Sequence, residues 1–215
     1  MAKLRGNLFG NFQGKLGLAY GRMVHGVNLG ANMPVKRGNE KGTQQMYDQQ
    51  KRFALLAVMA SGFMTAINLG LKAAAKSIGP LVSSFDAFIK LNAPSVHIEA
   101  GTQQVEYGSL IVAKGNLPQV GFTAADFSEP LQVSVSFTPN TSTPGADAND
   151  DVYITVLEPE SNMTVTSAAV KRSVGSIEMA LPSTWSGMTV HVYGFAVNAE
   201  GKASHSAFIA TGNVG

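Results

Sequence analysis

The chain has no cysteine and a single tryptophan among its 215 residues. Without cysteine, neither a disulfide framework nor a thiolate metal site can form. The opening residues, MAKLRGNLFGN, carry charge but lack the apolar core of about 7–15 residues that a secretory signal peptide needs. We therefore expect cytoplasmic synthesis without a signal peptide.

Long runs of purely apolar residues are also missing. The most apolar window, FALLAVMASGFMTAINLGL, has about the length of a bilayer span. However, Ser61, Thr65 and Asn68 interrupt it, together with glycine and other small residues. A buried amphipathic helix is the better interpretation, and we expect no association with a membrane.

Acidic residues are scarce in the first quarter of the chain. Residues 1–52 contain nine lysines and arginines against Glu40 and Asp48, a net charge of +7. Residues 94–215 contain four such cations and eleven acids, a net charge of −7. This split predicts two functional halves, of which the basic one could meet nucleic acid, an anionic surface or the acidic half of a neighbouring copy.

Sequence motifs for catalysis and nucleotide binding are absent. A P-loop ending at Gly14-Lys15 would need glycine at Phe9 and serine or threonine at Leu16. The four histidines form no zinc-binding pattern, and no nucleophile elbow is present. We therefore expect no enzymatic activity, no cofactor and no catalytic residue.

One segment has the spacing of a calcium-binding loop. Asp147, Asn149 and Asp151 alternate, and Glu158 stands at the twelfth position, but Val152 replaces the glycine that such a loop needs. The segment VYITVLE also favours a strand, which would carry Glu158 away from the other three. We expect an acidic hairpin tip and no metal site.

Glycine is abundant in the opening segment, with seven glycines between Gly6 and Gly30. The stretch KLGLAYGRM alternates apolar with small or polar residues, which is the period of a strand. His25-Gly26 suits a tight turn before the next extended run. These features predict a basic, glycine-rich arm over residues 1–42, with a β-hairpin from about residue 15 to about residue 35.

Residues 43–94 have helical periodicity. Thr43 suits the N-cap position of a first helix. Gly62 and Gly70 disfavour an unbroken helix, and we expect a break near Gly70 or at Ile78-Gly79-Pro80, because proline cannot continue a helix interior. A second helix should stop before Pro94, so the sequence predicts a helical hairpin. The apolar face of the first helix is predicted to contain Met46, Phe53, Leu56, Ala60, Phe63 and Ile67.

Residues 95–215 consist of short alternating segments separated by turn residues. Segments such as SVHIEA, SLIVAKG, LQVSVSFT, DVYITVLEP and MTVHVYGFAVN predict an antiparallel immunoglobulin- or fibronectin-like β-sandwich. Trp185 is expected to be a packing residue. The fold class is therefore α+β, with an N-terminal β-hairpin arm and a helical hairpin followed by this sandwich. We expect the sandwich to have its own core and to fold alone.

Several segments resemble an uncharacterised family that is common in Bacteroidota and in associated phages and mobile elements. The segments are GNLFGNFQGKLG, PVKRGNEKGTQQMYDQQKRFAL, INLGLK, SSFDAFIKLN, VEYGSLIVAKGNLPQV and MTVHVYGFAVNAEGKASHSAFI, in this order. Asn32-Met33 replaces the arginine that is usual before the LP-like motif. The resemblance implies the same domain order and no established activity.

Two functions fit these features. The first is a structural interaction protein that self-assembles as a homo-oligomer or joins other proteins of a particle, such as a phage virion or decoration component. The second is a nucleic-acid-binding protein that uses residues 1–52, whose cations could neutralise phosphates while an aromatic ring stacks on a base. The candidate interaction residues for both are Lys3, Arg5, Lys15, Tyr20, Arg22, Lys36, Arg37, Lys51 and Arg52.

Overall fold

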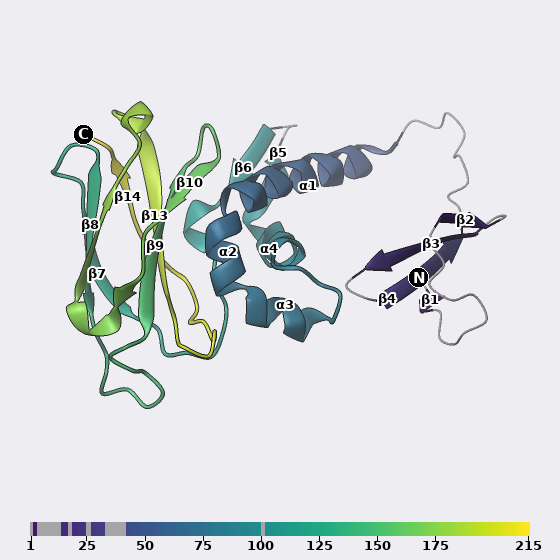
Figure 1. The fold of residues 1–215 in the computed structure, drawn as a ribbon. Helices are drawn as coiled ribbons and strands as arrows, with labels where there is room; N and C mark the ends of the chain where they lie inside the picture. Colours follow the sequence, from purple (N-terminus) through teal and green to yellow (C-terminus); the bar gives the residue numbers. More distant parts are fainter. Residues whose placement is uncertain (1, 4–13, 17–18, 25–26, 33–41, 100–101) are drawn as a thin grey trace. The chain divides into compact units, whose positions relative to one another are not determined.

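The computed structural model describes residues 2–3, 14–16, 19–24, 27–32, 42–99 and 102–215 (Figure 1). The chain divides into two compact units, residues 1–43 and residues 44–215. The first unit is a small sheet, and the second combines helices with a β-sandwich.

The N-terminal unit is a four-stranded antiparallel sheet with the strand order β1-β4-β3-β2. Two residues join β3 to β4, which is the length of a tight hairpin turn. The expected hairpin is confirmed for β3 and β4, but the segment KLGLAYGRM, predicted as one strand, forms two strands, β2 and β3, that pair with each other. Strand β1 adds to the other edge, and the turn at His25-Gly26 lies outside the described residues. The strands are β1 (Ala2–Lys3), β2 (Gly14–Leu16), β3 (Ala19–Val24) and β4 (Val27–Asn32).

Four helices lie within residues 42–99, where the sequence predicted a hairpin of two. They are α1 (Gln44–Gly62), α2 (Met64–Gly70), α3 (Lys72–Ile78) and α4 (Ser84–Asn92). The chain bends by 83° between α1 and α2. At this bend the Thr164 hydroxyl donates a hydrogen bond of 2.6 Å to the Gly62 carbonyl oxygen, so the end of α1 is held by a distant strand. At α4, Ser83 and Asp86 form a capping box.

No single helix in the described part of the chain is both long and apolar enough to cross a membrane. Helices α1 and α2 meet that condition only when they are joined, despite the bend between them.

The second unit contains two antiparallel sheets and a separate hairpin, so the α+β fold with a sandwich is confirmed. The five-stranded sheet has the order β10-β9-β13-β14, with β11 paired to β9, and the three-stranded sheet has the order β12-β8-β7. The first sheet contains β9 (Asp151–Glu158), β10 (Met163–Thr166), β11 (Val170–Lys171), β13 (Thr189–Val197) and β14 (Ala207–Asn213). The second contains β7 (Gly121–Asp126), β8 (Gln132–Thr138) and β12 (Ser176–Ala180), and the hairpin is β5 (Val96–Glu99) with β6 (Thr102–Val105).

The segment SLIVAKG, predicted to be a strand, is instead a buried loop that follows the 3-10 turn Tyr107–Ser109. Here the Asn92 side chain makes the backbone hydrogen bonds to Ile111 that a neighbouring strand would otherwise make. Its Oδ1 accepts a hydrogen bond of 2.6 Å from the Ile111 backbone N–H, and its Nδ2 donates one of 3.0 Å to the Ile111 carbonyl oxygen. The Val112 N–H donates to Ser206 Oγ and the Lys114 N–H to the Gly70 carbonyl oxygen. Side chains and neighbouring loops therefore satisfy the backbone of the apolar segment without sheet pairing.

The helices cover one face of the five-stranded sheet, and the three-stranded sheet covers the other (Figure 1). A first core lies between helices and sheet and contains Phe63, Phe88 and Phe195. A second core lies between the sheets and contains Val192 and Trp185, so the expected packing role of the tryptophan is confirmed. Strand β13 contributes to both cores, and the helices therefore complete the burial of the sandwich. The boundary expected at residue 95 does not separate two independent cores.

The predicted apolar face of the first helix is correct only in its second half. Leu56 and Phe63 are buried, whereas Met46 and Phe53 are 39% and 58% exposed. The first half of α1 extends past the other helices (Figure 1), and the buried residues of this helix begin only at Leu56. Helical periodicity gives the direction of a face but not how far along the helix that face is covered.

Candidate interaction surface

The described candidate residues fall in both compact units of the chain. Lys3, Lys15, Tyr20 and Arg22 lie in strands of the N-terminal sheet, whereas Lys51 and Arg52 lie on α1 in the other unit. The remaining candidates, Arg5, Lys36 and Arg37, are outside the described residues.

Strand register brings the four sheet residues together. Leu29 of β4 is paired with Lys3 on one side and with Arg22 on the other. Tyr20 of β3 is paired with Lys15. Paired residues of neighbouring strands lie on the same face, and so do residues two apart along one strand. The three cationic positions and the tyrosine position therefore occupy one face of the sheet.

Glycine forms a row across the opposite face. Ala2 pairs with Gly30, Gly30 pairs with Gly21, and Gly21 pairs with Gly14. The row crosses all four strands at spacings of about 4.8 Å and contains no side chain larger than a methyl group. Such a strip lets another backbone approach the sheet closely. In the sequence, Gly21 follows Gly14 by seven residues and Gly30 follows Gly21 by nine. Only the strand register shows that this spacing places the three glycines in one row.

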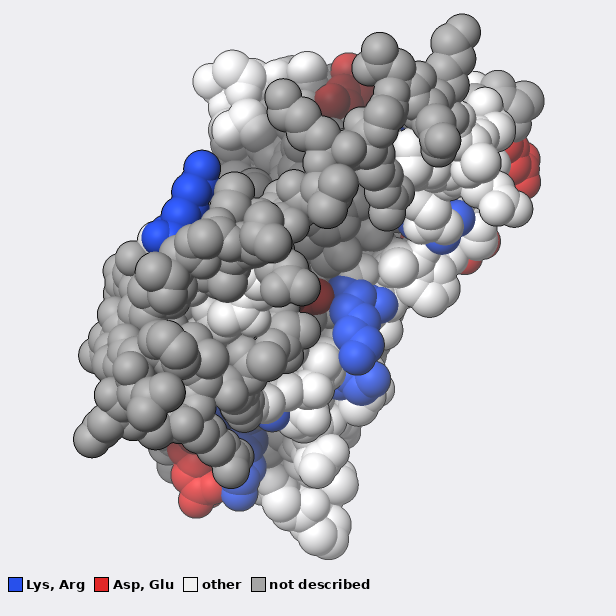
Figure 2. Space-filling view, turned by 90° about the vertical axis from the view of Figure 1, so that its right-hand side faces the viewer, with Lys and Arg blue, Asp and Glu red and all other residues white. Residues whose placement is uncertain are grey.

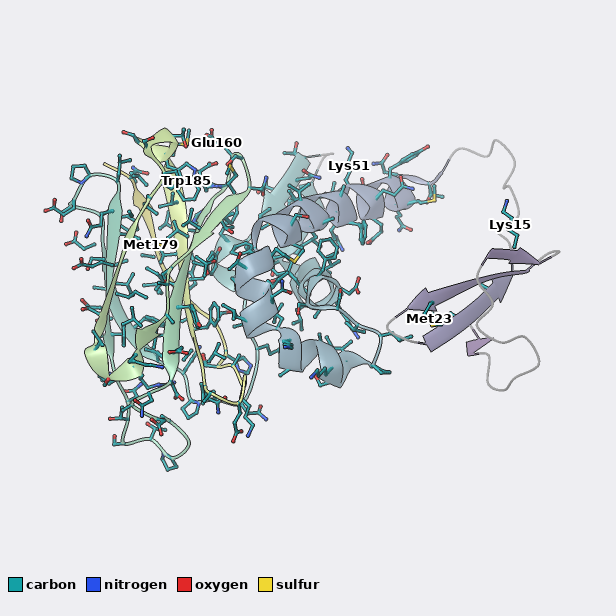
Figure 3. All side chains as sticks on the ribbon, in the orientation of Figure 1. Lys15, Met23, Lys51, Glu160, Met179 and Trp185 are labelled. Atoms are coloured by element: carbon teal, nitrogen blue, oxygen red, sulfur yellow. The ribbon has the colours of Figure 1, made fainter. Side chains whose placement is uncertain are left out.

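The two faces therefore differ in composition: the three cationic positions and the Tyr20 position lie on one, and the glycine row lies on the other, beside the uncharged positions Leu16, Met23, Asn28 and Asn32. Lys15 stands on β2 and is exposed (Figure 3). Figure 2 shows the described lysine and arginine side chains of one face of the molecule in blue, with acidic side chains in red beside some of them.

Lys51 and Arg52 have different surroundings on α1. Lys51 is exposed and projects from the helix (Figure 3), while its carbonyl oxygen accepts a hydrogen bond of 3.0 Å from Gln103 Nε2. Arg52 is half-buried and lines a polar groove of about 450 Å³ with Gln45, Asp48 and other residues. Arg52 is therefore part of the groove wall, whereas Lys15 of the sheet is exposed.

The residues with calcium-loop spacing have structural roles. Asp147 Oδ1 accepts a hydrogen bond of 2.8 Å from the Asn149 backbone N–H. The buried Asp150 accepts one of 3.0 Å from the Asp147 N–H and lies 3.2 Å from Arg172 Nε. Glu158 lies at the far end of β9. The described part of the chain contains no group of three or more histidine or acidic residues that could hold a metal ion.

A neutral cluster lies where the five-stranded sheet meets the loop before residue 110. The Tyr107 ring stacks on His191 with 4.2 Å between ring centroids, and Tyr193 Oη donates a hydrogen bond of 2.8 Å to the Tyr107 carbonyl oxygen. Burial lowers the pKa of His191. Burial, followed by the charge of Glu158, raises the pKa of Tyr107. These groups stay uncharged at neutral pH, as packing residues do.

Comparison with known proteins gives a family and a similar structure. No curated protein matches the chain. The fn3 domain of the human collagen alpha-1(XX) chain is similar at 19% sequence identity and a TM-score of 0.35, over 46% of this chain and 86% of that one. A family of unknown function, DUF6266, matches residues 11–210. The match spans most of the sequence, and the chain therefore belongs to the DUF6266 family.

Proposed function

We propose that the protein is a structural interaction protein that assembles with further copies of itself or with other proteins of a particle. The N-terminal sheet makes the contact. The observation that carries this proposal is the sheet with two dissimilar faces, one bearing cations at positions 3, 15 and 22 and the other bearing the glycine row. A sheet of this size gains stability by packing one face against another surface.

Charge supports a contact between the N-terminal sheet of one copy and the sandwich of another. Residues 1–52 have a net charge of +7 and residues 94–215 one of −7. Asp126, Glu129 and Glu160 of the sandwich are exposed, and none of them forms an ion pair within the described part of the chain. Opposite charges on two copies would steer their encounter and select their orientation.

The particle in this proposal is a phage virion, with the protein as a virion or decoration component. The support is the resemblance to proteins of Bacteroidota and of their phages and mobile elements. Synthesis in the cytoplasm followed by incorporation into a virion fits the same proposal.

A second function has its own support. The face that carries the three cationic positions also carries the Tyr20 position, paired directly with Lys15. Cations beside an aromatic ring suit a single-stranded nucleic acid, whose phosphates pair with the charges while a base stacks on the ring. Nucleic-acid binding through residues 1–52 is therefore the alternative to assembly.

The test reverses the charge of the sheet face in the full-length protein. The test variant combines Lys3→Glu, Lys15→Glu and Arg22→Glu. The control variant combines Lys72→Glu, Lys76→Glu and Lys90→Glu, three exposed lysines of α3 and α4. Both variants change the net charge equally, so a difference between them reports the position of the charges. Sedimentation gives the oligomeric mass, and the ratio of absorbance at 260 and 280 nm gives bound nucleic acid.

We expect the parent and the control variant to form an oligomer that weakens as salt screens the charges, and the sheet variant to be a monomer. If the sheet variant keeps the parent's mass but loses nucleic acid, the alternative function replaces the proposed one. A parent that is monomeric at low salt and free of nucleic acid contradicts both.

A further inference from the structure

A cavity of about 320 Å³ opens in the second unit, between helices α3 and α4 and two loops of the sandwich. Its walls come from segments far apart in the sequence: α3, the end of α4, the loop at residues 114–116 and the β13–β14 connection. The volume lies at the lower end of the range for small-molecule sites, about 300–1,000 Å³.

The cavity has an apolar wall and a cationic side. Ala74, Ile78 and Leu91 supply apolar surface from the helices. Lys114 and Lys202 line the cavity from the sandwich, and none of the described residues that line it is acidic. The lining also includes His205. Small-molecule sites are mostly apolar with a few convergent polar groups. Because the charged groups here are lysines, the cavity suits a small amphipathic anion.

Backbone hydrogen bonds hold the walls in place. The Lys114 N–H donates to the Gly70 carbonyl oxygen at 3.0 Å, which ties the loop to the α2–α3 junction. The Leu117 N–H donates to the Ala203 carbonyl oxygen at 3.1 Å, which ties the same loop to the β13–β14 connection. At Gly115 a Cβ atom would collide with the Ala203 carbonyl oxygen, so the two loops are as close as their backbones allow. The cavity is therefore preformed, and a ligand would not have to order it.

The charges in the cavity are available to a ligand. Lys202 forms an ion pair of 2.7 Å with Glu200, but both side chains are about two-thirds exposed, at 66% and 67%. An exposed pair of this kind contributes little free energy and exchanges readily. Lys114 is half-buried and has no carboxylate within ion-pair distance in the described part of the chain. An incoming anion would therefore gain a partially desolvated lysine without breaking a strong contact.

We propose that this cavity binds the carboxylate end of an apolar chain, with the carboxylate at Lys114 and Lys202 and the chain against Ala74, Ile78 and Leu91. A carboxylate carries one charge and can continue into an apolar body, so it uses both sides of the cavity. A free phosphate is strongly hydrated and would leave the apolar wall uncovered. The site is separate from the N-terminal sheet and does not depend on assembly.

Two sources supply this chemistry, a free fatty acid and the C-terminus of a polypeptide. The probes are octanoate for the first and the tripeptide acetyl-Gly-Leu-Leu for the second, each titrated calorimetrically into the full-length protein. Octanol and the C-terminal amide of the tripeptide serve as uncharged controls. We expect at least one of the two carboxylates to bind about tenfold or more tightly than its uncharged control, as a charge-assisted hydrogen bond would give.

The cationic side is tested by the double variant Lys114→Gln and Lys202→Gln, which should weaken binding by about tenfold or more. Its control is Lys72→Gln with Lys76→Gln, two exposed lysines on α3 that do not line the cavity. The apolar side is tested by Ala73→Leu, because Ala73 lines the cavity yet is exposed, so the larger side chain enters the cavity rather than the core. Thermal unfolding checks that each variant is folded.

Tighter binding of octanoate would identify a free acid as the ligand class, and tighter binding of the tripeptide a polypeptide C-terminus. Binding of octanol or the amide as tight as that of the matching carboxylate would overturn the proposal, because the lysines would then have no role. The absence of saturable binding by both carboxylates in the folded parent would overturn it as well.

Discussion

The ring of Phe63, at the junction of α1 and α2, meets the ring of Tyr193 edge to face, with 5.8 Å between the ring centroids. Both side chains are fully buried. Phe63 belongs to the helices and Tyr193 to the central strand β13, so this contact joins two layers through one apolar core. The stability of the sandwich should therefore depend on the helices.

Replacement of the two phenylalanines of the first helical segment should give unequal losses of stability. Phe63→Ala removes a fully buried ring and should lower the free energy of unfolding by about 3–5 kcal/mol. Phe53→Ala removes a ring that is 58% exposed and should change it by about 0.5 kcal/mol or less. Urea denaturation of both full-length variants measures the difference. Equal losses would mean that the first half of α1 is covered by protein.

Removal of the helices should prevent the sandwich from folding. A fragment of residues 95–215 exposes Tyr193 and Phe195 on the face that the helices cover. We expect this fragment to lack a cooperative thermal transition in calorimetry, whereas residues 44–215, which form one compact unit, should keep it. A cooperative transition in the shorter fragment would restore the independent sandwich that the sequence suggested.

The elements of the fold that depend on local pattern are the ones that the sequence predicts. Alternation identified β8, β9 and β13, and the second helix, expected to stop before Pro94, is α4. The same reasoning failed for the segment at residues 109–115, because distant groups, including the side chains of Asn92 and Ser206, satisfy its backbone in place of a paired strand. It expected a break near Gly70, where α2 ends, but not the bend after Gly62, which a hydrogen bond from Thr164 holds. Both failures have the same cause: contacts between residues that are far apart in the sequence, which local periodicity cannot reveal.

The composition of the candidate site could be predicted from the sequence, but the distribution of its residues over the two faces of the sheet could not. A basic, glycine-rich opening segment follows directly from the sequence. The division of the cations and the glycines between opposite faces requires the register that pairs Gly14 with Gly21 and Lys15 with Tyr20. Likewise, the cavity beside α3 joins residues 73–78 to residues 202–205, a proximity that only the fold creates.

Acid should destabilise the protein in part through Glu158. Burial acts to raise the pKa of this carboxyl, but hydrogen bonds from the Ser161 side chain and from the Ser161 and Glu160 backbone outweigh it, and the pKa lies below its ordinary value of 4.5. A lowered pKa in the folded state means that stability is present above about pH 4.5 and is lost as the pH falls through the lower, folded-state pKa. The matching change in the free energy of unfolding should appear in denaturation curves recorded at decreasing pH.

The variant Glu158→Gln isolates this contribution. It should be less stable than the parent at neutral pH and should lose less additional stability in acid. Glu178→Gln is the control, because Glu178 is an exposed residue of β12. Parallel pH profiles for the parent and Glu158→Gln would show that another carboxyl causes the acid sensitivity.

The buried pair of Asp150 and Arg172 should be strongly coupled. Arg172 Nε lies 3.2 Å from Asp150 Oδ2, and the two side chains are 0% and 3% exposed. The guanidinium also donates a hydrogen bond of 2.8 Å through Nη2 to the Pro118 carbonyl oxygen. Asp150→Asn leaves a buried cation without its counter-charge and should lower the free energy of unfolding by about 3–5 kcal/mol. Urea denaturation measures this loss.

A double-mutant cycle separates the pair from its surroundings. Combining Asp150→Asn with Arg172→Met removes both charges, so the double variant should lose clearly less stability than the sum of the two single variants. The neighbouring pair of Lys171 and Asp151, 2.6 Å apart but 53% and 33% exposed, is the matched control and should show a coupling of only about 0.2–1 kcal/mol. If the two cycles give the same coupling, burial does not strengthen the inner pair, and Asp150 is held by its turn rather than by the arginine.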